Sequence, residues 1–264
     1  MEIYSGKNIR NDIPCAITIG KFDGLHLGHR ALIDFMQKST NLPKALLTFS
    51  PHPASILAGE NIKAILSPHE KIQILEKLGI DIYIEYPFTK KFAELSPEEF
   101  LIDIIINQLS GQLLIVGENY KFGKNRLGNI QLAKKICAEY GAEVITFQHL
   151  QKDGQKISSN KIRKMIEINR IHLANALLGE PYFIMGKAER FGNVFVLRLP
   201  KDKLLPLGTE KYNVKIYAEN KTFYAKADIK ANSTIFVSDF VDGFNFPFSA
   251  LDIKTPCCFK LVFY

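Results

Sequence analysis

The chain has 264 residues, of which 47% are hydrophobic and 23% charged, and its 34 Lys and Arg exceed its 27 Asp and Glu to give a formal net charge of +7. These ordinary shares exclude a disordered chain, a fibrous repeat and a disulfide-stapled mini-protein, and the length suits about two domains. The positive charge favours an anionic partner: nucleic acid, a membrane surface and a phosphorylated small molecule all fit it.

The cysteines and the apolar runs bear on the compartment. Cys15, Cys137, Cys257 and Cys258 form neither a C-x-x-C pair nor a metal-binding spacing, which is typical of reduced thiols in a cytoplasmic protein. The first residues lack the apolar core of a signal peptide, and no run approaches the roughly 20 apolar residues that cross a bilayer. We therefore expect a cytoplasmic protein with no membrane segment.

The sequence up to about residue 180 alternates short apolar, β-branched runs with segments of helical periodicity. Strands are predicted at residues 16–20, 45–49, 80–84, 113–116 and 143–147, and helices at 26–39, 67–78, 100–109 and 130–140. Short connections between strands and helices imply right-handed crossovers and a parallel sheet covered on both faces. Because such sheets bind ligands at the carboxyl ends of their strands, we expect the chemistry directly after Gly20, Phe49 and Val116.

Two of the predicted helices begin with the same capping pattern. Ser67-Pro68-x-Glu70 and Ser96-Pro97-x-Glu99 each place a serine at the cap, a proline in the first turn and a glutamate that reaches back to the cap. We therefore expect these helices to begin directly after Ser67 and Ser96.

After Pro181 the pattern changes to a period of two residues. Such segments occur at residues 182–188, 194–199, 212–217, 222–229, 235–237 and 258–263, with turn residues at 192–193, 206–208 and 242–243. This pattern predicts a small antiparallel β-barrel or sandwich with almost no helix. The predicted fold class is therefore α/β: a Rossmann-like domain over residues 1–180, followed by the barrel over residues 181–264.

The sequence GKFDGLHLGH (residues 20–29) joins a predicted buried strand to a helix start. Gly24 and Gly28 let the backbone approach a ligand, and the free N–H groups of a helix start attract anions. His26 and His29 are three residues apart, so both rings can point to one side and donate hydrogen bonds to phosphate oxygens. The alternatives are a metal-binding pair, which lacks a third ligand at a usual spacing, and two surface histidines.

Two further loops follow predicted strands. The sequence TFSPHP (residues 48–53) places two prolines around a histidine, which fits a stiff ligand-binding loop and equally an ordinary rigid turn. The sequence GENYKFG (residues 117–123) offers the amide of Asn119 for hydrogen bonding and the ring of Phe122 for stacking. By itself, this loop also fits a solvated basic surface.

The sequence ISSNKIR (residues 157–163) combines two hydroxyls with an arginine at a predicted helix start. Serines in this position usually cap the helix, and taken alone this segment fits a cap better than a binding site. Arg163 lies one turn further on, where it can reach the same ligand as Ser158 and Ser159. Paired hydroxyls and a guanidinium fork suit phosphate binding.

Together these strings resemble a known family. His-x-Gly-His after the first strand, with a basic, hydroxyl-rich motif after the last, is the signature of the nucleotidyltransferase superfamily. The four longer strings, in this order and spacing, closely resemble the bacterial bifunctional riboflavin kinase/FMN adenylyltransferase (FAD synthetase) family. The resemblance covers roughly residues 10–185, about two thirds of the chain.

The resemblance implies transfer of AMP from ATP to FMN, with Mg²⁺ accompanying ATP, to give FAD and pyrophosphate. ATP and FMN are then the expected partners, with no membrane or nucleic acid. By carry-over from the family, the catalytic residues are His26, His29 and Arg163; the ATP-binding residues are Gly20, Lys21, Phe22, Asp23, Gly24, Ser158 and Ser159; and the FMN-binding residues are Phe49, His52, Pro53, Asn119 and Phe122. The sequence names no metal ligand and no oligomeric state. Asn160 stands where the family usually has Thr or Ser, so we expect altered contacts there.

The barrel departs from the family pattern. The family's kinase carries a Pro-Thr-Ala-Asn motif and a catalytic glutamate, whereas this chain has no Pro-Thr dipeptide and no glutamate after Glu219. Asp228 or Asp239 would have to replace the base, and residues 243–247 echo a family Gly-Phe-Pro stretch too late in the chain. We interpret the barrel as a degenerate kinase kept for packing, association or substrate delivery; a fully bifunctional enzyme is the alternative.

Three other classes of protein share parts of this pattern. A sister adenylyltransferase acting on pantetheine phosphate or nicotinate mononucleotide has the His-x-Gly-His loop, but is not expected to carry both TFSPHP and GENYKFG. A class I aminoacyl-tRNA synthetase has the loop too, but this chain lacks an obvious anticodon-binding module. A non-catalytic flavin-binding or nucleic-acid-binding protein fits the altered barrel, and the intact loops argue against it. Its binding to nucleic acid would weaken with salt.

Overall fold

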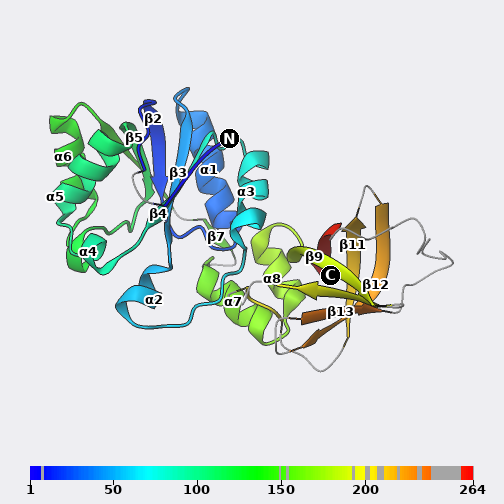
Figure 1. Ribbon diagram of the computed structural model, residues 1–264. Coiled ribbons are helices and arrows are strands. Elements are labelled where there is room, and N and C mark those ends of the chain that lie inside the picture. The colour runs from blue at the N-terminus through cyan, green and yellow to red at the C-terminus, as the bar shows by residue number, and fades with distance from the viewer. Residues whose placement is uncertain are drawn as a thin grey trace. The chain divides into compact units, whose positions relative to one another are not determined.

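The computed structural model (Figure 1) describes residues 1–6, 9–148, 150–152, 155–191, 194–199, 203–206, 211–218, 221–230, 234–238 and 257–263. The chain forms two compact units. The first comprises Met1–Ile62 and Ile72–Lys156, and the second comprises Lys63–Lys71 and Ile157–Tyr264. The change of sequence pattern near residue 181 thus falls inside the second unit, and as a domain boundary it stays a prediction.

The first unit is built on a parallel sheet, as the sequence predicts, and the sheet has six strands where five were predicted. Its strands are β1 (Glu2–Ser5), β2 (Cys15–Ile19), β3 (Lys44–Ser50), β4 (Ile82–Pro87), β5 (Gly111–Gly117) and β6 (Glu143–Phe147), in the order β1-β4-β3-β2-β5-β6. Every residue of the central strand β2 is buried. The sequence analysis missed β1, because this short, mostly exposed edge strand lacks an apolar run.

Helices cover both faces of this sheet. The helical segments of the first unit are α1 (Leu27–Ser39), α2 (Pro53–Leu57), α4 (Lys90–Ala93), α5 (Pro97–Glu99), η1 (Phe100–Gln108), η2 (Lys124–Arg126) and α6 (Ile130–Glu139). Figure 1 shows α1 and α6 on opposite sides of the strands. The odd-numbered side chains of β2 pack with η1 and α6 in one apolar cluster, and the even-numbered ones point to the other face.

The predicted capping patterns are present at both helix starts. Ser96 accepts the N–H of Glu99, whose carboxylate accepts the Ser96 N–H at 2.7 Å, and this bond lowers the pKa of Glu99. The same reciprocal bonds join Ser67 and Glu70 at the start of α3 (Pro68–Lys77). The helix predicted at 100–109 is also found. It is a π-helix, with hydrogen bonds that span five residues, such as the one from the Leu109 N–H to the Ile104 carbonyl.

The second unit contains the predicted antiparallel barrel. Its strands are β9 (Phe183–Phe191), β10 (Val194–Arg198), β11 (Tyr212–Ala218), β12 (Lys221–Lys230), β13 (Thr234–Ser238) and β14 (Cys257–Phe263), closed in the order β10-β13-β12-β11-β14-β9. All six predicted strands are found. The predicted turns at 192–193 and 242–243, and residues 207–208 of the third, lie outside the described residues.

Outside the parallel sheet and the barrel, the described residues form two further helices and one pair of short strands. Helices α7 (Ser159–Glu167) and α8 (Ile171–Leu178) belong to the second unit, and the strands β7 (Gln151–Lys152) and β8 (Gln155–Lys156) pair with each other at the end of the first. Among the described residues, no helix is long and apolar enough to span a membrane.

Candidate active site

The sheet order of the first unit gathers three of the predicted loops at one edge. Strand β2 lies between β3 and β5, and all three run parallel. The loops that follow them therefore leave from neighbouring carboxyl ends. The chain passes from β2 to β3 on one side and returns to β5 on the other, which makes this edge a topological switch point where open α/β sheets bind ligands.

The loop after β2 has a strained backbone that its surroundings hold in place. Phe22 and Leu25 adopt positive φ values of 44° and 43°, which are unusual for residues other than glycine. The Thr48 hydroxyl donates to the Lys21 carbonyl at 2.8 Å, and Arg30 Nε donates to the Leu25 carbonyl at 2.9 Å. Strain held by such bonds is common at functional sites. Sequence reasoning assigned no role to Thr48 or Arg30.

The two histidines of this loop lie together at the start of α1. His26 is the N-cap, and its Nδ1 accepts the His29 N–H at 3.4 Å. The two imidazoles stack with centroids 3.7 Å apart and planes 13° apart, and the Phe22 ring lies 4.9 Å from that of His29. Since Nδ1 of His26 accepts, geometry assigns the proton of the neutral ring to Nε2. The rings thus lie on one side, as the spacing predicts.

The other residues predicted in this loop differ in exposure. Lys21 is exposed, Asp23 is buried, and Gly24 has a φ of 91°, which favours glycine. A Cβ built on Gly20 would lie 3.1 Å from the Phe22 ring, so any side chain there would require that ring to shift by a few tenths of an ångström. Within the described ranges, no three His, Cys, Asp or Glu side chains come together in a way that could hold a metal ion.

The loop after β3 places a third histidine at a helix start. His52 is the N-cap of α2, and its Nδ1 accepts the Ala54 N–H at 3.2 Å. His52 and Pro53 are both half-buried. Phe49, at the end of β3, packs against the rings of Phe88 and Phe92 at centroid distances of 5.7 and 5.6 Å. Sequence reasoning missed these two aromatic neighbours.

The loop after β5 is packed more tightly than expected. The ring of Phe122 is only 5% exposed and lies against Tyr120 at 5.3 Å and Phe100 at 5.9 Å. A Cβ on Gly128 would meet the Phe122 ring at 2.7 Å. Asn119 is exposed, so it is the accessible member of the two residues predicted here. Burial raises the pKa of the Tyr120 phenol.

The serines and the arginine of ISSNKIR stand at the start of α7, in the second unit. Ser158 Oγ accepts the Lys161 N–H at 3.3 Å, so Ser158 does cap the helix, and Ser159 is the first helical residue. Arg163 donates from Nη1 to Asn160 Oδ1 at 2.8 Å and from Nε to the Lys63 carbonyl at 3.1 Å. The side chain of Asn160 thus helps to hold the guanidinium of Arg163.

The candidates for a kinase base are only partly described. Asp228 lies on β12, and its carboxylate forms an ion pair with Lys230 at 2.6 Å. Asp239 and residues 243–247 lie outside the described residues. The assignment of a kinase base therefore stays a prediction.

Comparisons with known proteins agree on one family. The family model described as FAD synthetase matches residues 8–161. The bifunctional riboflavin kinase/FMN adenylyltransferase of Buchnera aphidicola subsp. Schizaphis graminum is 34% identical over 248 residues, covering 89% of this chain and 79% of that protein. The FAD synthetase of Listeria monocytogenes is 36% identical over 66% of this chain and 72% of that protein. Several further relatives with the bifunctional name are matched over 56% of their own length.

The architecture is also found among solved structures. The crystal structure titled Macrolide-efflux Protein from Streptococcus pneumoniae has a TM-score of 0.84 to this chain at 23% identity. The similarity covers 100% of this chain and 90% of that chain. At this identity, it establishes a shared fold.

Proposed function

Because the chain belongs to the FAD synthetase family of nucleotidyltransferases, we propose that it transfers AMP from ATP to FMN. A phosphate oxygen of FMN attacks the α-phosphorus of ATP in line, and the bond between the α-phosphorus and the bridging oxygen breaks. FAD forms and pyrophosphate leaves. The observation that carries the proposal is the stacked His26–His29 pair, which begins α1 at the switch point of the sheet.

The chain's own residues act by positioning and by stabilising charge. His26 and His29 donate to phosphate oxygens that gain charge in the transition state, and the first N–H groups of α1 add positive potential. Residues 20–24 line the nucleotide. Ser158, Ser159 and Arg163 contact the phosphates, with the guanidinium pre-oriented by Asn160 and Lys63. Mg²⁺ arrives with ATP as part of the substrate.

The flavin nucleotide binds beside the loops after β3 and β5. Their proposed contacts are Phe49, His52, Pro53, Asn119 and Phe122. Phe49 and Phe122 are already packed against other aromatic rings, so they shape the wall more than they move to meet the ligand. ATP and FMN are both anions, so a site that binds them explains part of the net charge of +7, and no nucleic-acid partner is needed to explain it. We place the reaction in the cytoplasm.

The proposed function predicts which flavin serves as acceptor. With ATP and Mg²⁺, the purified chain is expected to convert FMN to FAD with release of pyrophosphate, and to leave riboflavin unchanged because the barrel lacks the Pro-Thr motif. Chromatography of the flavins and a pyrophosphate assay measure both. FMN or FAD formed from riboflavin would instead establish the fully bifunctional enzyme. Absence of FAD from FMN would contradict the proposed transfer.

A substitution at Gly28 tests the His26 geometry without removing a histidine. A Cβ at residue 28 would lie 3.3 Å from two atoms of the His26 ring, so Gly28→Ala is expected to push that ring by a few tenths of an ångström. Alanine also favours the helix, so the melting temperature should not fall. We expect kcat for FAD formation to drop about tenfold, since small misplacements of catalytic groups are costly. An unchanged kcat would show that His26 tolerates displacement.

A further inference from the structure

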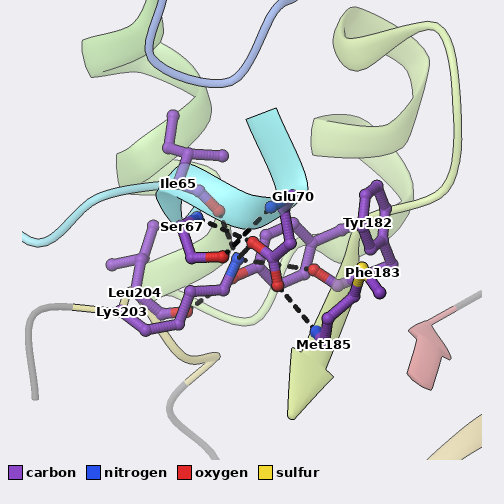
Figure 2. A network of polar contacts seen from close by, with 8 residues as sticks. All are labelled: Ile65, Ser67, Glu70, Tyr182, Phe183, Met185, Lys203 and Leu204. Atoms are coloured by element: carbon purple, nitrogen blue, oxygen red, sulfur yellow. Dashed lines mark hydrogen bonds and ion pairs between the residues drawn. The ribbon is translucent and has the colours of Figure 1, made fainter. Parts of the chain in front are cut away.

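A buried ion pair joins two distant stretches of the second unit. Nζ of Lys203 lies 2.6 Å from Oε2 of Glu70, and the side chains are 1% and 0% exposed (Figure 2). The cost of removing two charges from water is large, and such a pair persists only where hydrogen bonds satisfy both groups. Sequence reasoning gave Glu70 a capping role and gave Lys203 none.

Both charged groups are fully engaged. Besides Glu70, the Lys203 ammonium donates to the carbonyls of Ile65 at 2.6 Å and Phe183 at 3.4 Å, which uses its three protons. The Glu70 carboxylate also accepts the N–H of Met185 at 2.7 Å and the N–H of Ser67 at 2.8 Å. The pair therefore ties the stretch Lys63–Lys71 to the first barrel strand, β9.

Backbone bonds fasten the same stretch beside Lys203. The Leu204 N–H donates to the Ala64 carbonyl at 2.8 Å, and Ala64 pairs with Lys203 in a parallel bridge. The hydroxyl of the buried Tyr182 donates to the Leu204 carbonyl, and the Tyr182 ring lies 4.9 Å from the Lys203 ammonium. Figure 2 shows these groups converging on the start of α3.

The stretch Lys63–Lys71 begins with the residue whose backbone carbonyl accepts a hydrogen bond from Arg163. Lys63 immediately precedes Ala64, and its carbonyl accepts the hydrogen bond from Arg163 Nε at 3.1 Å. The two residues that follow this acceptor are both hydrogen-bonded: the Ala64 carbonyl accepts from the Leu204 N–H, and the Ile65 carbonyl accepts from the Lys203 ammonium. Every group in this path belongs to the second unit.

We infer that Lys203 and Glu70 are positioning residues for AMP transfer, which hold the Lys63 carbonyl and through it the guanidinium of Arg163. This inference rests on the proposed function. It gives the barrel a task in the transferase reaction: the barrel side of the unit supplies the lysine that fixes an arginine of the phosphate-binding motif. The task does not require the barrel to phosphorylate riboflavin.

A double-mutant cycle on the full chain tests whether Lys203 acts through Arg163. Lys203→Met is expected to lower kcat for FAD formation about tenfold or more, with little change in KM for FMN, because it misplaces one group without removing it. In the Arg163→Ala background, the same change is expected to alter kcat by less than about twofold, since the group it positions is gone. An unchanged kcat in Lys203→Met, or effects of the two changes that multiply, would overturn the inference.

Two further variants separate positioning from general damage. Lys226→Met removes an exposed lysine of β12 and is the matched control, expected to keep kcat within about twofold. If Lys203→Met alone does not fold, the double variant Glu70→Leu/Lys203→Met leaves no unpaired buried charge and takes its place in the cycle. Full activity in that double variant would also overturn the inference. If the unaltered chain makes no FAD, both the proposed function and the inference fail, whereas FAD formation with multiplying effects removes the positioning role alone.

Discussion

Replacing His29 with alanine is expected to lower kcat for FAD formation by about two decades or more. The His29 imidazole lies stacked on His26 at the start of α1, where the proposed reaction needs donors to the phosphate oxygens. Such a donor binds most strongly in the transition state, so KM for ATP should change less than kcat. Initial rates of pyrophosphate release with FMN and ATP measure both constants.

His29 is a cleaner target than His26. Nδ1 of His26 accepts a backbone N–H at the start of α1, so its removal would also cost about 1 kcal/mol of helix capping. His172 is exposed in α8, and His172→Ala is the matched control, expected to leave kcat and melting temperature near those of the parent chain. Near-normal turnover in His29→Ala, with a normal control, would remove the proposed role.

Local signals in the sequence predicted five of the six strands of the parallel sheet and the six strands of the barrel. Buried strands such as β2 are continuous apolar runs, and the Ser67–Glu70 pattern marks the start of α3 because cap and glutamate lie three residues apart. Capping uses only one part of Glu70, however. Its ion pair with Lys203 spans 133 residues, and nothing in the local pattern of either residue indicates it. From the sequence alone, a lysine that is buried in the folded protein cannot be distinguished from one that is exposed.

The candidate site likewise has features that could be predicted from the sequence and features that could not. Parallel strands place their carboxyl ends at one edge of the sheet, so the alternation of strands and helices in the sequence was enough to predict that the three loops lie at that edge. The packing of the loop residues could not. Phe122 was expected to offer a face for stacking, but in the structure its ring is covered by those of Tyr120 and Phe100. The sequence could not predict this, because nothing in it distinguishes a buried aromatic residue of a loop from an exposed one.

The two hydrogen-bond acceptors of the Arg163 guanidinium show most clearly what can and cannot be predicted from the sequence. Asn160 lies three residues earlier, on the same side of a helix, so its bond to the guanidinium follows from helical spacing. The second partner is a backbone carbonyl 100 residues away. Every residue has such a carbonyl, so sequence carries no mark of the one that is used, and only the folded second unit shows it.

Arg163→Ala is expected to reduce kcat for FAD formation by about two decades, because it removes a charge-assisted contact to the transferring phosphates. Lys164→Ala, at the next and exposed position of α7, is the matched control and should leave the rate within about twofold. Rates of FAD formation at saturating FMN and ATP measure both variants. Activity of Arg163→Ala equal to that of the control would exclude a catalytic role.

Arg163→Lys then separates charge from geometry. The lysine keeps the positive charge but cannot donate to Asn160 Oδ1 and the Lys63 carbonyl while also presenting a planar fork to phosphate. If orientation matters as the two bonds indicate, this variant should recover no more than about a tenth of the parent kcat. Recovery of full activity would mean that a point charge suffices, and the bonds that hold the guanidinium would then serve the stability of the second unit and not the reaction.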